Sequence, residues 1–263
     1  MQICRSPFLI WCTGRTGSTY LCDLLNSHPQ IYCRGEDFAE DVVTDGELSE
    51  HPTFEVKRRH FTRRINRPDG AIVHPDRAEA IGYLRQLMSQ EYLACGFKLK
   101  FPNQPVVFAE VVDELRQMPN VHLIGLHRKN SLKQAISLRN LERLRALRAR
   151  LNSGNSKSAV EMESFELDVE AAVKDARFFR RSKSEFERFA EGFDRVRVIA
   201  YEELVESNGP IEELLRFLGI AESSHKWKSK FKKISPDKIS DAISNYQELA
   251  DAVAGSQLEQ FLD

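Results

Sequence analysis

The chain has 263 residues, 41% of them hydrophobic, which is enough to bury one substantial core. Its 38 basic and 39 acidic residues give a formal net charge of −1, which argues against a protein that coats nucleic acid with its whole surface. Its five cysteines lack any C-x-x-C pair, so neither a zinc site nor a disulfide framework is indicated, and a reducing compartment is expected.

The apolar runs of the chain are all short. None approaches the roughly 20 residues of a membrane span, and a first strand that starts by Pro7 leaves no room for a signal peptide. We therefore expect a cytoplasmic protein with neither a membrane nor a nucleic acid as its partner. The length suits one α/β domain, so we expect residues 1–263 to form a single domain.

Buried strands and helices alternate in the predicted element order. The apolar runs predict strands at 8–12, 97–101, 121–126 and 196–201. Helical periodicity predicts helices at 20–25, 76–92, 105–117, 131–151, 165–189 and 211–218. This alternation predicts an α/β fold in which a mostly parallel central sheet is flanked by helices on both faces.

The first predicted strand ends in a short cationic loop that two glycines bracket. The loop and the start of the next helix read Gly14, Arg15, Thr16, Gly17, Ser18 and Thr19. The glycines allow consecutive N–H groups to point at one oxyanion, and the following helix turns its positive end toward the same place. Ser18 and Thr19 add hydroxyl donors, which also suit a helix cap. We interpret the loop as an anion site in which Arg15 supplies a permanent charge.

This loop differs from the Walker A motif of nucleotide triphosphatases. Its glycines lie three residues apart, and no lysine precedes Ser18. Where such enzymes place a magnesium-binding aspartate after a strand, this chain has Arg128 and Lys129. A transferring sulfuryl group carries less negative charge than a phosphoryl group, so cations and backbone donors suffice for it. The pattern favours sulfuryl transfer without a metal.

These segments resemble the sulfotransferases that use 3′-phosphoadenosine-5′-phosphosulfate (PAPS), especially the bacterial Stf0-like trehalose sulfotransferase branch. The family's loop for the 5′-phosphosulfate is similar to residues 15–19, and its 3′-phosphate signature is similar to residues 127–138. Alignment on Ser137 puts Lys129 at the family's usual arginine position and Arg128 one residue earlier, so both remain candidates for the 3′-phosphate. The resemblance implies a P-loop-type three-layer fold and PAPS as the donor.

Glu36 resembles the general base of the Stf0-like branch. Sulfuryl transfer needs such a base, because the acceptor hydroxyl loses a proton as its oxygen attacks sulfur. His28 is the second candidate. Lys98 lies in a segment, 96–101, that resembles a strand near the donor, and it shares one face of that strand with Lys100. Because an unpaired buried ammonium is costly, we expect Lys98 to face the donor cleft.

The charge distribution agrees with one anion-binding region. Residues 127–150 hold eight Lys or Arg and one acidic residue, whereas residues 36–50 hold seven acidic residues and no basic one. Arg15 and the pair Arg128 and Lys129 each follow the end of a predicted strand. In parallel sheets the carboxyl ends of the strands line one crevice, so we expect these cations to converge there.

The resemblance also indicates the chemical class of the acceptor. It implies a hydroxyl of a carbohydrate or small metabolite, held by variable segments that we place at 34–60 and 139–165. Two alternatives remain, a metal-dependent P-loop kinase and an inactive nucleotide-binding protein of the same fold. A homodimer also stays open, because amphipathic helices pack equally well within and between chains.

Overall fold

The computed structural model describes residues 4–36, 38, 40–44, 62–67, 70–75, 77–102, 108–150, 163–221, 227–229, 236 and 238–262. Of the two predicted acceptor segments, residues 45–60 and 151–162 therefore lie outside the described residues. None of the described helices combines the length and the apolarity that a bilayer crossing requires.

The described residues form a central sheet of five parallel strands. These are β1 (Ser6–Thr13), β2 (Ile31–Arg34), β6 (Ala94–Phe101), β7 (His122–His127) and β8 (Val196–Ala200), in the spatial order β2-β6-β1-β7-β8. The predicted parallel sheet is confirmed, and four of its strands were predicted within a few residues. The prediction missed β2, whose four residues are too few to show a clear period.

Helices follow most of the strands. They are α1 (Ser18–Asn26), α2 (Arg77–Met88), α3 (Phe108–Arg116), α4 (Ser131–Arg150), α5 (Val169–Ala190), α6 (Tyr201–Glu206), α7 (Gly209–Phe217), α8 (Ile239–Ala242) and α9 (Tyr246–Val253), with a 3-10 turn at Glu259–Phe261. The helix predicted from residue 165 begins at Val169 instead, because the Asp168 carboxylate accepts a hydrogen bond from the Ala171 N–H and caps it there.

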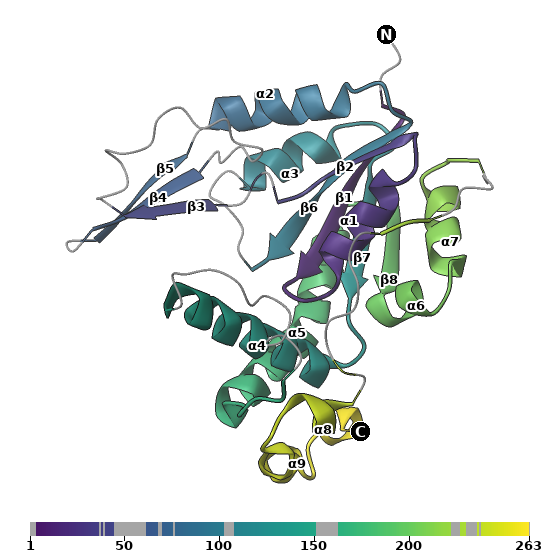
Figure 1. The fold of residues 1–263 in the computed structure, drawn as a ribbon. Coiled ribbons are helices and arrows are strands. Elements are labelled where there is room, and N and C mark those ends of the chain that lie inside the picture. Colours follow the sequence, from purple (N-terminus) through teal and green to yellow (C-terminus); the bar gives the residue numbers. More distant parts are fainter. Residues whose placement is uncertain are drawn as a thin grey trace.

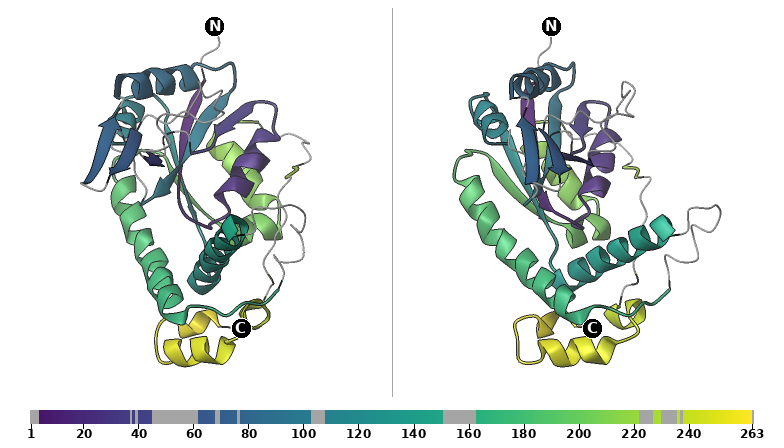
Figure 2. Two further views of the ribbon diagram at one scale, coloured as in Figure 1. Left: turned by 60° about the vertical axis from the view of Figure 1, so that its left-hand side comes forward. Right: turned by 90° about the vertical axis from the view of Figure 1, so that its left-hand side faces the viewer.

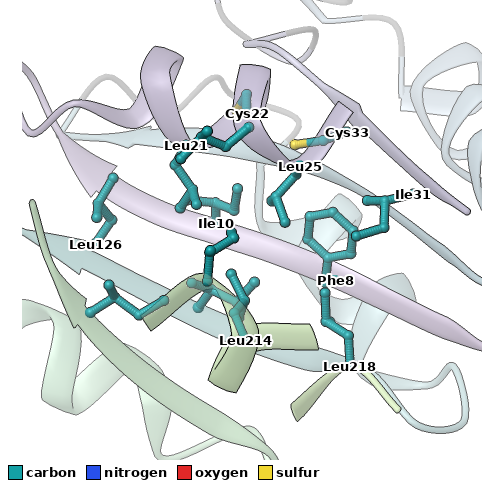
Figure 3. Close-up of a cluster of buried hydrophobic side chains, with 14 of the residues drawn as sticks. Phe8, Ile10, Leu21, Cys22, Leu25, Ile31, Cys33, Leu126, Leu214 and Leu218 are labelled. Atoms are coloured by element: carbon teal, nitrogen blue, oxygen red, sulfur yellow. The ribbon is translucent and has the colours of Figure 1, made fainter. Parts of the chain in front are cut away.

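The sheet is the middle of three layers, with α1 and α7 on one face and α2, α3 and α5 on the other (Figures 1 and 2). Alternation along β1 explains the two cores. Phe8 and Ile10 pack with α1 and α7 (Figure 3), whereas Leu9 and Trp11 pack with the helices of the opposite face. Both cores thus pack against β1, and this packing fixes the position of the loop that follows its carboxyl end.

Two additions to this frame were not predicted. A smaller sheet of β3 (Glu40–Thr44), β4 (Thr62–Arg67) and β5 (Gly70–Pro75) lies to one side of the central sheet (Figure 1). A third apolar cluster joins α4 and α5 to α8 and α9, so the C-terminal helices pack on this pair rather than on the sheet (Figure 2).

The strand register decides which loops meet. Cys12 of β1 lies beside Leu126 of β7, and Thr13 lies beside Phe101 of β6. The segments that follow these three strands therefore leave the sheet at one edge.

Candidate active site

The loop after β1 has a left-handed backbone at one of its two glycines, Gly17, and at Arg15 rather than at Gly14. Gly17 has φ 78° and Arg15 has φ 64°, both in the left-handed region. Thr16 is buried, and its hydroxyl donates a hydrogen bond to the Thr13 carbonyl at 3.0 Å. Among the described residues no side chain caps α1, which starts at Ser18. The positive end of α1 therefore opens onto the loop, as an anion site requires.

Helix α4 holds this loop from the side. The Arg15 Nε donates a hydrogen bond to the Ser137 Oγ at 3.0 Å. One turn earlier on α4, the Gln134 amide donates to the Thr13 Oγ1 at 2.8 Å and to the Gly14 carbonyl at 2.6 Å. The structure thus brings the residues predicted for the two ends of the donor into direct contact.

Arg128 is an almost fully buried cation at the end of β7. Its side chain is 10% exposed, and its guanidinium lies 5.2 Å from the centre of the Tyr201 ring. Its Nε has no hydrogen-bond partner among the described residues, and the Glu202 carboxylate is 3.8 Å away. Burial lowers the pKa of Arg128, and Glu202 opposes this effect only in part. An anion at this position would satisfy the guanidinium.

Lys129 points elsewhere. Its ammonium pairs with the Glu203 carboxylate at 2.9 Å, and its side chain is 55% exposed. The hydrogen bond with Glu203 raises the pKa of Lys129. A pocket between α4 and the C-terminal helices is lined by Arg128 and Ser137 but not by Lys129. Of the two candidates for the 3′-phosphate, Arg128 is therefore the one beside Ser137.

Arg15 lies in a field of like charge. Burial and then the charges of Arg128 and Arg145 lower the pKa of Arg15. Three guanidinium groups therefore act on one region, and such a concentration of positive charge attracts a polyanion.

Lys98 contacts both Glu36 and helix α1. Its side chain is 8% exposed, and its ammonium lies 3.2 Å from the Glu36 carboxylate and donates to the Thr19 Oγ1 at 3.0 Å. Lys100 lies on the same face of β6, close to Gly14, whose added Cβ would approach the lysine Cε to 3.2 Å. Phe97 packs in the core of the opposite face, as the alternation predicted.

His28 lies away from this group. It follows the carboxyl end of α1 and precedes β2, at the sheet edge opposite the loop. Its ring is buried and stacks on Trp227 at a centroid distance of 5.9 Å. Between the two predicted general bases, Glu36 is the one linked to the loop through Lys98.

Three residues of the site were missed by the sequence prediction. Gln134 holds the loop, the Tyr201 ring packs against Gly17, and Glu202 accepts a hydrogen bond from the Lys129 N–H at 2.9 Å. The position of Gln134, one turn before Ser137, was the available signal, since both lie on one helix face. Among the described residues no group of three His, Cys, Asp or Glu side chains could hold a metal ion.

The parallel sheet, the glycine loop after its first strand and the cationic edge define an α/β protein of the P-loop type. A model of the sulfotransferase family matches residues 7–224. The chain therefore belongs to the sulfotransferase family. No curated protein matches it.

Several solved sulfotransferases resemble the chain. The enzyme of Alicyclobacillus acidocaldarius is 16% identical, with 99% of this chain and 96% of that chain covered and a TM-score of 0.48. The sulfotransferase domain of the Synechococcus PCC 7002 olefin synthase is 16% identical, with 86% and 77% covered and a TM-score of 0.40. Mouse sulfotransferase SULT7A1 complexed with PAP is 12% identical, with 97% and 87% covered and a TM-score of 0.41. These TM-scores lie below 0.5, so the likenesses carry no argument about the ligands of this chain.

Proposed function

We propose that the protein transfers the sulfuryl group of PAPS to an acceptor hydroxyl, giving a sulfate ester and adenosine 3′,5′-bisphosphate (PAP). The observation that carries this proposal is the hydrogen bond between Arg15 and Ser137. It joins the loop expected at the 5′-phosphosulfate to the serine expected at the 3′-phosphate. One nucleotide with phosphates at both ends matches two such neighbouring cationic positions.

The residues present fit this donor. Arg128, whose buried Nε has no hydrogen-bond partner among the described side chains, lines the same pocket as Ser137, and there its guanidinium would bind the 3′-phosphate. The Tyr20 and Tyr201 rings, 6.5 Å apart, add aromatic surface beside the loop, which suits a purine.

Each group then has a distinct part in the reaction. The loop N–H groups and Arg15 would bind the 5′-phosphosulfate, and Arg15 would stabilise negative charge that develops on the leaving phosphate. PAPS supplies the activated sulfuryl group. Glu36 would accept the proton of the acceptor hydroxyl as its oxygen attacks, while Lys98 holds the carboxylate in place.

The position of the proposed general base, Glu36, indicates where the acceptor would bind. Glu36 comes directly after β2, so the acceptor hydroxyl would lie over the carboxyl ends of β2 and β6. The resemblance of Glu36 to the base of the Stf0-like branch is the ground on which we propose a carbohydrate hydroxyl as the acceptor.

Ligand binding tests the proposal directly. In the presence of EDTA, we expect PAP to raise the melting temperature of the protein and ATP to have little effect. Incubation with radiolabelled PAPS and a metabolite extract should then yield a labelled sulfate ester. Stabilisation by ATP with magnesium but not by PAP would instead identify a P-loop kinase, and tight PAP binding without turnover of any acceptor would identify an inactive nucleotide-binding protein.

A further inference from the structure

Another pocket lies beside the carboxyl end of α1, along the edge strand β2. Its lining comes from the end of α1, from β2 and from Tyr92, and it includes Asn26, Tyr32 and Cys33. Because β2 has a neighbour on one side only, the pocket opens at the edge of the sheet. Cys33 lines this pocket, although only 4% of the residue is exposed.

Cys33 faces a second thiol, that of Cys22 on α1. Both sulfurs lie within hydrogen-bond range of one acceptor, the Arg34 carbonyl, at 3.9 Å for Cys22 and 3.7 Å for Cys33. Figure 3 shows the two side chains on neighbouring segments, with the Cys33 sulfur turned toward α1. The Asn26 side chain holds Cys33 in this position, because it donates to the Cys33 carbonyl at 2.7 Å and accepts from the Cys33 N–H at 2.8 Å.

The surroundings favour reaction at this pair over reaction at the nearby Cys12. A hydrogen bond from Cys33 lowers the pKa of Cys22, burial opposes this effect, and the charge of Lys98 lowers the pKa further, so that the net direction is down. Burial instead raises the pKa of Cys12 to about 11. The thiolate is the reactive form of cysteine, so Cys12 stays inert while Cys22 is activated.

We propose that Cys22 and Cys33 are a redox-sensitive pair that hydrogen peroxide converts to a disulfide. The Cys22 thiolate attacks one oxygen of a peroxide molecule that enters beside Cys33, the O–O bond breaks, and the released hydroxide takes up a proton and leaves as water. The Cys33 thiol then attacks the sulfenic sulfur of Cys22 and gives its proton to the departing hydroxyl, which leaves as a second water. Two thiols and one peroxide thus give one disulfide and two waters, and a thiol reductant reverses the change.

The disulfide regulates the donor site, a consequence that rests on the proposed function. Cys22 lies one turn after Thr19 on α1, and Cys33 lies three residues before Glu36. Lys98 bridges Thr19 and Glu36. A disulfide fixes the two sulfurs at about 2.05 Å and so ties α1 to β2, the two elements next to the partners of Lys98. Oxidation therefore weakens donor binding.

The test begins with the intact wild-type chain. The protein is treated with hydrogen peroxide, its free thiols are blocked, and its digest is analysed by mass spectrometry. PAP affinity is measured by calorimetry before oxidation, after oxidation and after dithiothreitol. We expect a peptide crosslinked through Cys22 and Cys33, and a loss of PAP affinity of about tenfold or more that dithiothreitol restores. Absence of the crosslink, or a crosslink that leaves PAP affinity unchanged, overturns the proposal.

Matched variants locate the effect. Cys33→Ser and Cys22→Ser should each make PAP binding insensitive to peroxide, whereas Cys95→Ser should leave the sensitivity intact. Cys95 is a matched control because it hydrogen-bonds a second thiol, that of Cys4, in the core on the opposite face of the sheet from Cys22 and Cys33. Thermal melting checks that each variant folds. If the reduced wild-type protein does not bind PAP, the proposed function and the regulation both fall, while the crosslinked peptide alone still decides whether the pair forms.

Discussion

Arg15 and Ser137 are hydrogen-bonded at 3.0 Å although 122 residues separate them in the chain. Neither residue belongs to a strand. Arg15 lies in the loop after β1, and Ser137 lies in the second turn of α4 after β7. Their contact exists because β1 and β7 are adjacent and parallel, so that their loops share one edge of the sheet. This pair is therefore the natural place to begin testing the site.

Replacement of Arg15 by glutamine should weaken PAP binding by about 10- to 100-fold, because a charge-assisted hydrogen bond is worth about 1.5–3 kcal/mol. Calorimetry with PAP measures the loss. Arg85→Gln is the matched control, since Arg85 forms only an exposed ion pair with Glu114 on the far helices α2 and α3. Equal affinities of the Arg15 variant and the wild type would contradict the assignment.

Substitutions of Arg128 and of Lys129 should change the PAP affinity measured by calorimetry to clearly different extents. Arg128→Gln should lower PAP affinity by at least about tenfold, because it removes a buried cation from the pocket that Ser137 lines. Lys129→Gln should change the affinity by less than about twofold, since its ammonium is exposed and paired with Glu203. The reverse ranking would assign the 3′-phosphate to Lys129.

Glu36→Gln should lower kcat by about 10²- to 10⁴-fold, because a general base contributes a factor of that size. PAP affinity should change far less than kcat, since Glu36 is expected at the acceptor and reaches the donor loop only through Lys98. Rates with labelled PAPS, beside PAP calorimetry, separate the two effects. A variant that keeps its kcat would remove Glu36 from the role of base, and Glu203→Gln provides the control for loss of a carboxylate near α6.

Gly17→Ala should destabilise the fold by more than about 1–2 kcal/mol, the usual cost of a left-handed backbone for a residue with a Cβ. The added Cβ would also lie 2.2 Å from the Tyr201 Cδ2. Urea unfolding measures the change. Gly35→Ala is the matched control, because no atom lies within 4 Å of its added Cβ, and its effect should stay within about 0.5 kcal/mol. Similar stabilities of the two variants would refute this account of the loop.

Stability should fall as the pH drops from 7.5 to 5.5. Burial, and then the charges of Arg195 and Lys183 respectively, lower the pKa values of His122 and His127. Histidines of the unfolded chain have the ordinary pKa of about 6.5, so near this pH the unfolded chain binds more protons than the folded chain does. Protonation therefore favours unfolding. Urea unfolding at both pH values measures this difference. His122→Gln should reduce the dependence on pH, and an unchanged dependence would exclude His122 as a contributor.

The elements that sequence patterns predicted are those with strong local signals. The apolar run of β1 and the glycines of residues 14–17 identify a strand and a turn without reference to any distant residue. By contrast, β2 and the small sheet of β3, β4 and β5 were missed, because short or charged strands become recognisable only when their partners are known.

The amino-acid sequence by itself determined the parallel α/β fold, the glycine loop after the first strand and the cationic segment after the third predicted strand, since these depend on periodicity and residue type over a few positions. Tertiary structure placed the alternatives that the sequence left open in different surroundings. It buried Arg128 beside Ser137 and paired Lys129 with Glu203, and it joined Glu36 to the loop through Lys98 while placing His28 at the opposite edge. Neighbouring residues that follow a strand point their side chains in different directions. The packing of helices that are remote in the sequence then fixes which of these side chains faces the crevice at the carboxyl ends of the strands.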